Sequence, residues 1–156
     1  MDRRKFLESM ALALGAQMIV PLQRVMAANV DIDPVKLTGV ADLFSESERA
    51  HVAAVSEVIM PTTDTPGAIA AVVPQYIEFM LGEWYDEPER DRFVTALRQW
   101  MGTLDRSFVE ASQDKQHELV QLLHDGGVAV MANGGREFFE HVKQLTLAGY
   151  YTSEVG

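Results

Sequence analysis

Two prolines five residues apart, Pro61 and Pro66, constrain this chain more than any other feature. Each proline fixes its φ angle and lacks an amide hydrogen, so no helix continues through the stretch that contains them. Turn-forming polar side chains fill positions 62–65, and Pro66-Gly67 fits the two central positions of a type II turn. The sequence therefore predicts a rigid, irregular loop over residues 59–68. Such loops often carry function, although turn chemistry alone also explains every residue in it.

Apolar residues recur at helical spacing on both sides of this loop, and no stretch shows the sustained alternation of a half-buried strand. Capping and first-turn signals mark the predicted helix starts. Ser45 and Glu48 form a capping box, Pro74 and Pro88 suit the first helical position, with Asp86 shortly before Pro88, and Ser112 is an N-cap. Asn133-Gly134-Gly135 precedes the last predicted helix. Gly149 is predicted to cap the last helix, with residues 150–156 outside it.

The residues expected to face the core share this spacing: Val52, Val55, Val58 and Ile59; Ile77, Met80, Leu81 and Trp84; Phe93, Leu97, Trp100, Met101, Leu104 and Phe108; Leu119, Leu122 and Leu123; and Phe138, Phe139, Val142, Leu145 and Leu147. The chain has 156 residues, which suits one domain. We therefore predict an all-α fold: a compact bundle of about five helices with a long irregular Pro/Gly loop, preceded by an N-terminal signal helix.

The N-terminus resembles an export signal. Arg3 and Arg4 are followed by Lys5, Phe6 and Leu7, and an uncharged run over residues 9–23 comes next. This run is too short for a membrane-spanning helix, and small residues near Ala28 fit a cleavage site. Paired arginines before Phe-Leu resemble a twin-arginine signal, the alternative being an ordinary amphipathic helix. We accordingly divide the chain into a signal segment (1–28), a linker (29–44) and a helical domain (45–156).

Composition excludes several classes of function. The net charge is −10; residues 1–28 carry +2, so the remainder carries −12, and nucleic acid is excluded as a partner by repulsion from phosphate. The chain has no cysteine, which excludes thiolate metal sites, a cysteine nucleophile and covalent c-type haem. No phosphate-binding loop or nucleophile elbow is present, so we expect neither catalytic nor cofactor-binding residues on this chain.

One pattern points to a metal. Glu48 and His51 have the Glu-x-x-His spacing found in di-iron carboxylate bundles, but the nearest second copy, Asp114 and His117, has the wrong acid. Because Glu48 is already explained by the capping box, a metal site is the weaker interpretation.

Two segments are candidate partner-binding surfaces. Adjacent tyrosines, Tyr150 and Tyr151, carry hydroxyl groups that need partners, and such aromatics are enriched in interfaces; a tail packed on its own helices is the equal alternative. The predicted partner interface comprises Thr62, Thr63, Asp64, Thr65, Pro66, Gly67, Tyr150, Tyr151, Thr152 and Ser153.

With these residues in place, the chain resembles the gluconate 2-dehydrogenase subunit 3 family. The matching motifs are Arg3-Arg4-Lys5-Phe6-Leu7, the loop Pro61-Thr62-Thr63-Asp64-Thr65-Pro66-Gly67-Ala68, the helix Tyr76-Ile77-Glu78-Phe79-Met80-Leu81, and Leu145-Thr146-Leu147-Ala148-Gly149-Tyr150-Tyr151-Thr152-Ser153-Glu154. Family members commonly continue past this last motif, whereas this sequence stops at Gly156, so we expect either that a contact made by that tail is missing or that the chain represents a short-ended branch of the family.

The resemblance implies a non-catalytic small subunit of a periplasmic dehydrogenase complex. In such complexes a large glucose-methanol-choline-type subunit holds FAD and oxidises a sugar hydroxyl, and a cytochrome c subunit with haem c often accepts the electrons. The small subunit carries the twin-arginine signal, and the large subunit requires it for maturation or stability. Membrane association through the complex is then expected.

Two alternatives from other classes remain open. One is a free-standing helical adaptor without a dehydrogenase partner, and the other is the di-iron bundle. The oxidised sugar is not encoded here, because its contacts belong to the large subunit; gluconate, fructose, sorbitol, glucose and glycosides are all compatible.

Overall fold

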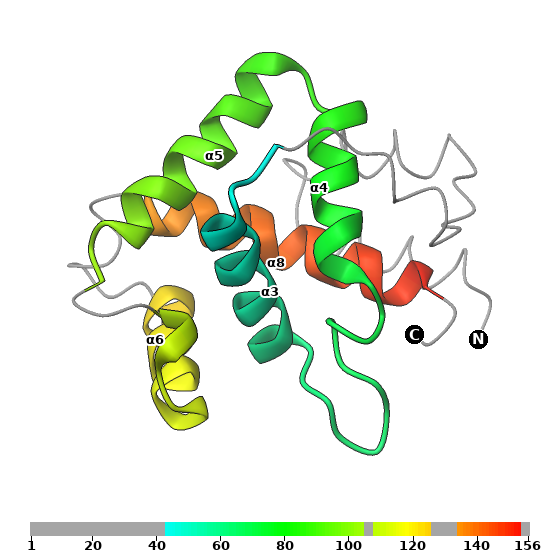
Figure 1. Cartoon of the computed structure of the whole chain (residues 1–156), viewed down its shortest axis with the longest axis vertical. Helices are drawn as coiled ribbons and strands as arrows, with labels where there is room; N and C mark the ends of the chain where they lie inside the picture. The colour runs from blue at the N-terminus through cyan, green and yellow to red at the C-terminus, as the bar shows by residue number, and fades with distance from the viewer. Residues whose placement is uncertain (1–42, 105–107, 126–133, 154–156) are drawn as a thin grey trace. The chain divides into compact units, whose positions relative to one another are not determined.

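A computed structural model describes residues 43–104, 108–125 and 134–153, which belong to the unit formed by residues 32–156. They form five α-helices and one short 3-10 helix (Figure 1): α3 (Glu46–Ile59), α4 (Val73–Glu83), α5 (Glu87–Met101), η3 (Phe108–Glu110), α6 (Gln113–Asp125) and α8 (Gly135–Thr152). Since this part of the chain contains no strand, the prediction of an all-α fold with about five helices is confirmed.

The predicted signal segment with Arg3, Arg4, Phe6 and Leu7 lies outside the described residues, as does the linker up to Asp42. Within the described residues, no helix is both long enough and apolar enough to span a membrane.

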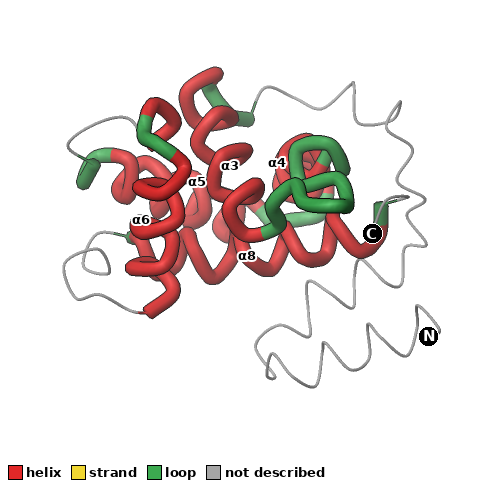
Figure 2. Tube along the Cα trace, turned by 90° about the horizontal axis from the view of Figure 1, so that it is seen from below, coloured by secondary structure: helices red, strands yellow, loops and turns green. Residues whose placement is uncertain are grey.

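Helix α8 contacts each of the other four α-helices that the described residues form. It packs against α3, α4, α5 and α6 (Figures 1 and 2). Its buried apolar residues follow helical spacing on one broad face: Phe138, Phe139, Val142, Leu145, Ala148 and Tyr150. The last helix in the sequence is therefore central to the domain core.

Aromatic rings fill the centre of the core between α5 and α8. The Trp100 ring stacks on the Phe138 ring with centroids 5.0 Å apart. The Phe93 ring meets the Phe138 ring edge-on at 5.6 Å. Phe108 of η3 packs on Trp100 at 5.4 Å. Trp100 is 1% exposed, so its predicted core position is confirmed.

Two details of the predicted core are wrong. The apolar run from Phe93 to Phe108 is not one helix: α5 ends at Met101, where Gly102 and a turn follow, and Phe108 reaches the core from η3. In α6, Leu122 is 39% exposed and Val120 is buried in its place. The spacing of leucines predicted an apolar face, but contacts with α3 and α8 select a face rotated around the helix.

Gly149 does not cap the last helix. Helix α8 continues to Thr152, and Ser153 is its C-cap. A Cβ atom on Gly149 would lie 2.5 Å from Cδ1 of Tyr76, a fully buried side chain of α4. Glycine is required here because α4 and α8 approach each other closely, and not because the helix ends.

This close approach predicts the outcome of two glycine substitutions. Gly149→Ala forces the Tyr76 ring to move, so we expect a loss of about 1–3 kcal/mol in the free energy of unfolding, measured by urea denaturation. Gly102→Ala is the matched control, because its Cβ meets nothing nearer than 3.4 Å and its φ is −67°. Equal stability of the two variants would contradict the packing described here.

Candidate functional site

The connection between α3 and α4 is a closed, projecting loop. The amide of Ala68 donates to the carbonyl of Met60 at 2.8 Å, which ties the two ends together. Residues 61–66 are exposed, whereas Gly67 and Ala68 are buried. In Figure 1 the loop extends beyond the adjoining ends of α3 and α4. The predicted irregular segment therefore presents a row of accessible polar and proline residues.

Glu57, in the last turn of α3, holds both ends of this loop. Its Oε1 accepts hydrogen bonds from the amide of Thr62 at 2.9 Å and from the Thr62 hydroxyl at 2.7 Å. Its Oε2 accepts from the amide of Ile69 at 2.9 Å. One carboxylate thus satisfies two backbone amides that a regular element would otherwise pair, together with one side-chain hydroxyl.

Sequence reasoning missed Glu57, although one signal was available. An acidic side chain near a helix C-terminus is disfavoured by the helix dipole. Glu57 has this position in α3, whose last turn contains no basic residue. An acid at this position suggests a compensating interaction, and the structure shows that the loop provides it.

Gly67 does not serve the type II turn that its sequence context predicts. Its φ angle is not positive; within the described residues only Val72 and Gly134 have positive φ angles. A Cβ atom on Gly67 would instead collide with Oε1 of Glu57 and lie 2.6 Å from the amide nitrogen of Thr62. The glycine lets its backbone approach the bonded pair, and its amide donates to the Thr62 hydroxyl at 3.1 Å.

Tyr150 joins the two segments of the predicted partner interface. Its hydroxyl donates to the carbonyl of Pro66 at 2.8 Å, although 84 positions separate the two residues. Tyr150 is 6% exposed and its ring meets Tyr151 edge-on at 5.6 Å. Tyr150 therefore bonds the loop from the last turn of α8, and its neighbour Tyr151 is half-buried.

The polar residues after the tyrosines complete the end of α8. The Thr152 hydroxyl donates to the carbonyl of Ala148 at 2.7 Å, and the Ser153 hydroxyl donates to that of Tyr150 at 2.6 Å. The carbonyl of Tyr150 is one of the last four of α8, which have no partner within the helix, and the Ser153 amide also donates to the carbonyl of Gly149 at 3.1 Å. These bonds also explain why no capping glycine is needed at this end.

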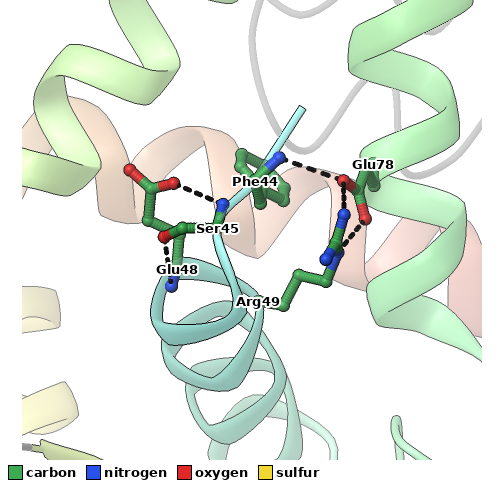
Figure 3. Close-up of polar contacts among 5 residues, drawn as sticks. All are labelled: Phe44, Ser45, Glu48, Arg49 and Glu78. Carbon is green, nitrogen blue, oxygen red and sulfur yellow. Dashed lines mark hydrogen bonds and ion pairs between the residues drawn. The ribbon is translucent and has the colours of Figure 1, made fainter. Parts of the chain in front are cut away.

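Glu78 fixes the entry of the chain into α3, as Figure 3 shows. Its Oε1 accepts from the backbone amide of Phe44 at 3.0 Å, and its carboxylate accepts two bonds from the Arg49 guanidinium at 2.9 and 3.0 Å. Glu78 is 8% exposed. A buried carboxylate needs such partners, because leaving it unpaired costs several kcal/mol. The sequence placed Glu78 in a helix but gave no sign of this role.

The predicted capping box is confirmed. Glu48 accepts from the amide of Ser45 at 2.7 Å, and the amide of Glu48 donates to the Ser45 hydroxyl at 3.3 Å (Figure 3). Glu48 also forms an ion pair with Arg98 of α5. Burial raises the pKa of Glu48, but the bonds from Arg98 and Ser45 outweigh it, so this pKa lies below its ordinary value.

The candidate di-iron residues are engaged in other contacts. Glu48 bonds Ser45 and Arg98, while Nδ1 of His51 lies 2.7 Å from the carbonyl of Ser47 and its ring packs against Trp100. Within residues 43–104, 108–125 and 134–153, no three His, Asp or Glu side chains come together as a metal site requires. His141 of α8, which is outside the candidate di-iron set, makes the same kind of contact as His51: its Nδ1 lies 2.8 Å from the carbonyl of Glu137.

Comparison with known proteins gives one match. The sequence profile described as gluconate 2-dehydrogenase subunit 3 matches residues 46–156, more than half of the chain. The chain belongs to the gluconate 2-dehydrogenase subunit 3 family. No curated protein and no solved structure matches it. The family region begins at the first residue of α3, so it includes the loop, Glu57 and Tyr150.

The capping box and ion pair of Glu48 predict a pH-dependent stability. A carboxyl group whose pKa falls on folding stabilises the fold above its unfolded pKa, and this stabilisation is lost as pH falls through the folded pKa. We expect Glu48→Gln to lose roughly 0.5–1 kcal/mol at pH 7, since Arg98 is largely exposed. The difference from the wild type should shrink as pH falls below the ordinary carboxyl pKa of about 4.3 and through the lower pKa of the folded Glu48, because the wild-type carboxyl then becomes neutral like the amide.

Thermal melts of both proteins between pH 3 and 7 measure this difference. Glu46→Gln is the control, because Glu46 lies exposed in the same first turn of α3. A gap between wild type and Glu48→Gln that stays constant with pH would contradict the electrostatic explanation.

Proposed function

We propose that this chain is the non-catalytic small subunit of a periplasmic, FAD-dependent sugar or glycoside dehydrogenase complex. In this proposal it supports the export, maturation and stability of a glucose-methanol-choline-type flavoprotein subunit. The observation that carries the proposal is the family match over residues 46–156, which belongs to a subunit of a dehydrogenase. FAD is held by the large subunit, and haem c by a cytochrome subunit where one is present.

The loop of residues 61–66 is the proposed contact with the large subunit. It is exposed, and Glu57, Tyr150 and its own prolines hold it in one conformation. Ordering such a loop on binding costs little conformational entropy, so more of the contact energy appears as affinity. Tyr151, Thr152 and Ser153 lie next to this support and extend the proposed interface.

Export is the second part of the proposal. Residues 1–28 carry the pattern of a twin-arginine signal, with Arg3, Arg4, Phe6 and Leu7. A signal of this type suits a complex exported already folded, with the flavin inserted in the partner. One signal on the small subunit then serves both chains.

Replacing Arg3 and Arg4 together by Lys tests this part. We expect the double variant to retain both the small subunit and the flavoprotein in the cytoplasm, because lysine does not reproduce the planar guanidinium pair. Cell fractionation with antibodies against both chains measures the distribution. A flavoprotein that still reached the periplasm in this variant would contradict the shared signal.

Thr63→Arg tests the loop contact. The substitution places a long charged side chain on the exposed loop, and we expect the affinity for the large subunit to fall by about tenfold or more, as for a disrupted interface anchor. Binding is measured by titrating the purified large subunit. Thr95→Arg makes the same change on the exposed face of α5 and is expected to leave binding unchanged.

Two outcomes would count against the proposal. Equal affinities of Thr63→Arg and Thr95→Arg would move the interface away from the loop. Recovery of the native chain from its host without any flavoprotein would instead favour the free-standing adaptor.

A further inference from the structure

A small pocket lies where α6 packs against the last turn of α3 and against α8. Its volume is about 180 Å³. Val58 and Ile59 of α3 and Phe139 of α8 form an apolar wall. His117 and His124 come from α6, and Lys143 comes from α8. The pocket thus combines an apolar wall with two histidines and one lysine.

The charge of this pocket is opposite to that of the chain. The whole chain has 23 acidic and 13 basic residues, yet among the described residues that line the pocket there is no aspartate or glutamate. Both histidines are exposed and Lys143 is half-buried, so their polar ends are accessible. A basic pocket on an acidic protein favours a negatively charged ligand.

Lys143 and Arg92 are the two cations of the described segments that have no carboxylate within 4 Å, and of these two only Lys143 lines the pocket. The other cations of these segments lie within 4 Å of a carboxylate: Arg49, Arg90, Arg98, Lys115 and Arg136. The Nζ of Lys143 lies 3.5 Å from Nδ1 of His124 and 5.8 Å from the centre of the Phe139 ring.

The geometry around His124 is suited to a carboxylate. In the tautomer that carries its hydrogen on Nε2, His124 can accept from Lys143 at Nδ1 and donate from Nε2. The ring of His124 is held edge-on against Phe139 at 6.0 Å. The ammonium of Lys143 and the imidazole then supply adjacent donors to a single anionic group.

The size of the pocket limits which molecule can present the carboxylate. Pockets that enclose a free ligand typically measure about 300–1,000 Å³. A volume of about 180 Å³ lies below that range and suits a small acidic group, such as the end of one acidic side chain. We propose that this pocket receives the carboxylate of an Asp or Glu side chain on the large subunit; the identity of this carrier rests on the proposed function.

The test reverses the charge of the pocket in the full chain. We expect Lys143→Glu to weaken binding of the purified large subunit by about tenfold or more, because a like-charge pair replaces an attractive one. Lys115→Glu is the matched control: it makes the same charge change on α6, outside the pocket, and is expected to change binding less than about twofold. Equal losses in the two variants would overturn the proposal, because net charge alone would then explain them.

A second measurement separates failure of the pocket from failure of the proposed function. The full chain is titrated by NMR with the blocked peptide acetyl-Ala-Leu-Glu-Leu-Ala-amide, with its Gln analogue, and with isovalerate as a free carboxylate. We expect the Glu peptide alone to shift the signals of His124 and Lys143. If the wild-type chain binds no flavoprotein yet gives this result, the proposed function fails and the carboxylate pocket stands.

The remaining outcomes count against the pocket. Equal shifts with the Glu and Gln peptides, or no shift with either, would overturn carboxylate recognition. Stronger binding of isovalerate than of the Glu peptide would overturn the assignment to a polypeptide side chain and identify a small-acid site. Circular dichroism melts of Lys143→Glu and Lys115→Glu check that both variants remain folded.

Discussion

The close contact between α4 and α8 is the constraint on which the candidate interface depends. Gly149 lets the Tyr76 ring lie directly against the α8 backbone, so the last turn of α8 is fixed relative to α4. Tyr150 follows in that turn, and its hydroxyl reaches the carbonyl of Pro66 only because α8 is held there. A loop 84 positions away in sequence is thereby supported by the core. Any loosening between α4 and α8 would therefore weaken the bond from Tyr150 that supports the loop.

Buried polar groups show how this domain tolerates charge in its interior. Glu48 and Glu78 are buried, but each carboxylate accepts bonds from a backbone amide and from an arginine on another helix or turn. Tyr76 is the contrasting case: its hydroxyl is buried and has no hydrogen-bond partner among the described residues, and burial raises its pKa. A buried hydroxyl without a hydrogen bond lowers the free energy of unfolding by about 1–3 kcal/mol. The fully buried ring, packed on Gly149, offsets this cost through its apolar area.

Local chemistry could be predicted from the sequence, and long-range bonds could not. The capping box of Ser45 and Glu48 depends on residues three positions apart, so its pattern identifies it directly. Two prolines placed the loop correctly for the same reason. In contrast, the bonds from Tyr150 to Pro66 and from Phe44 to Glu78 join residues 84 and 34 positions apart, and nothing in the spacing of the chain specifies them. Gly67 illustrates the difference, because its local context indicates a turn while its actual constraint is the carboxylate of Glu57.

The last turn of α3 connects the two proposed contact regions. Glu57 holds the loop, while the next two residues, Val58 and Ile59, line the basic pocket. Because an α-helix rises only about 1.5 Å per residue, these functions are fixed within a few ångströms along one rigid segment. The loop and the pocket therefore cannot shift independently unless this turn unwinds. A partner that contacts both would meet a pre-organised surface and would also stabilise the end of α3 against fraying, since it would bind only the folded turn.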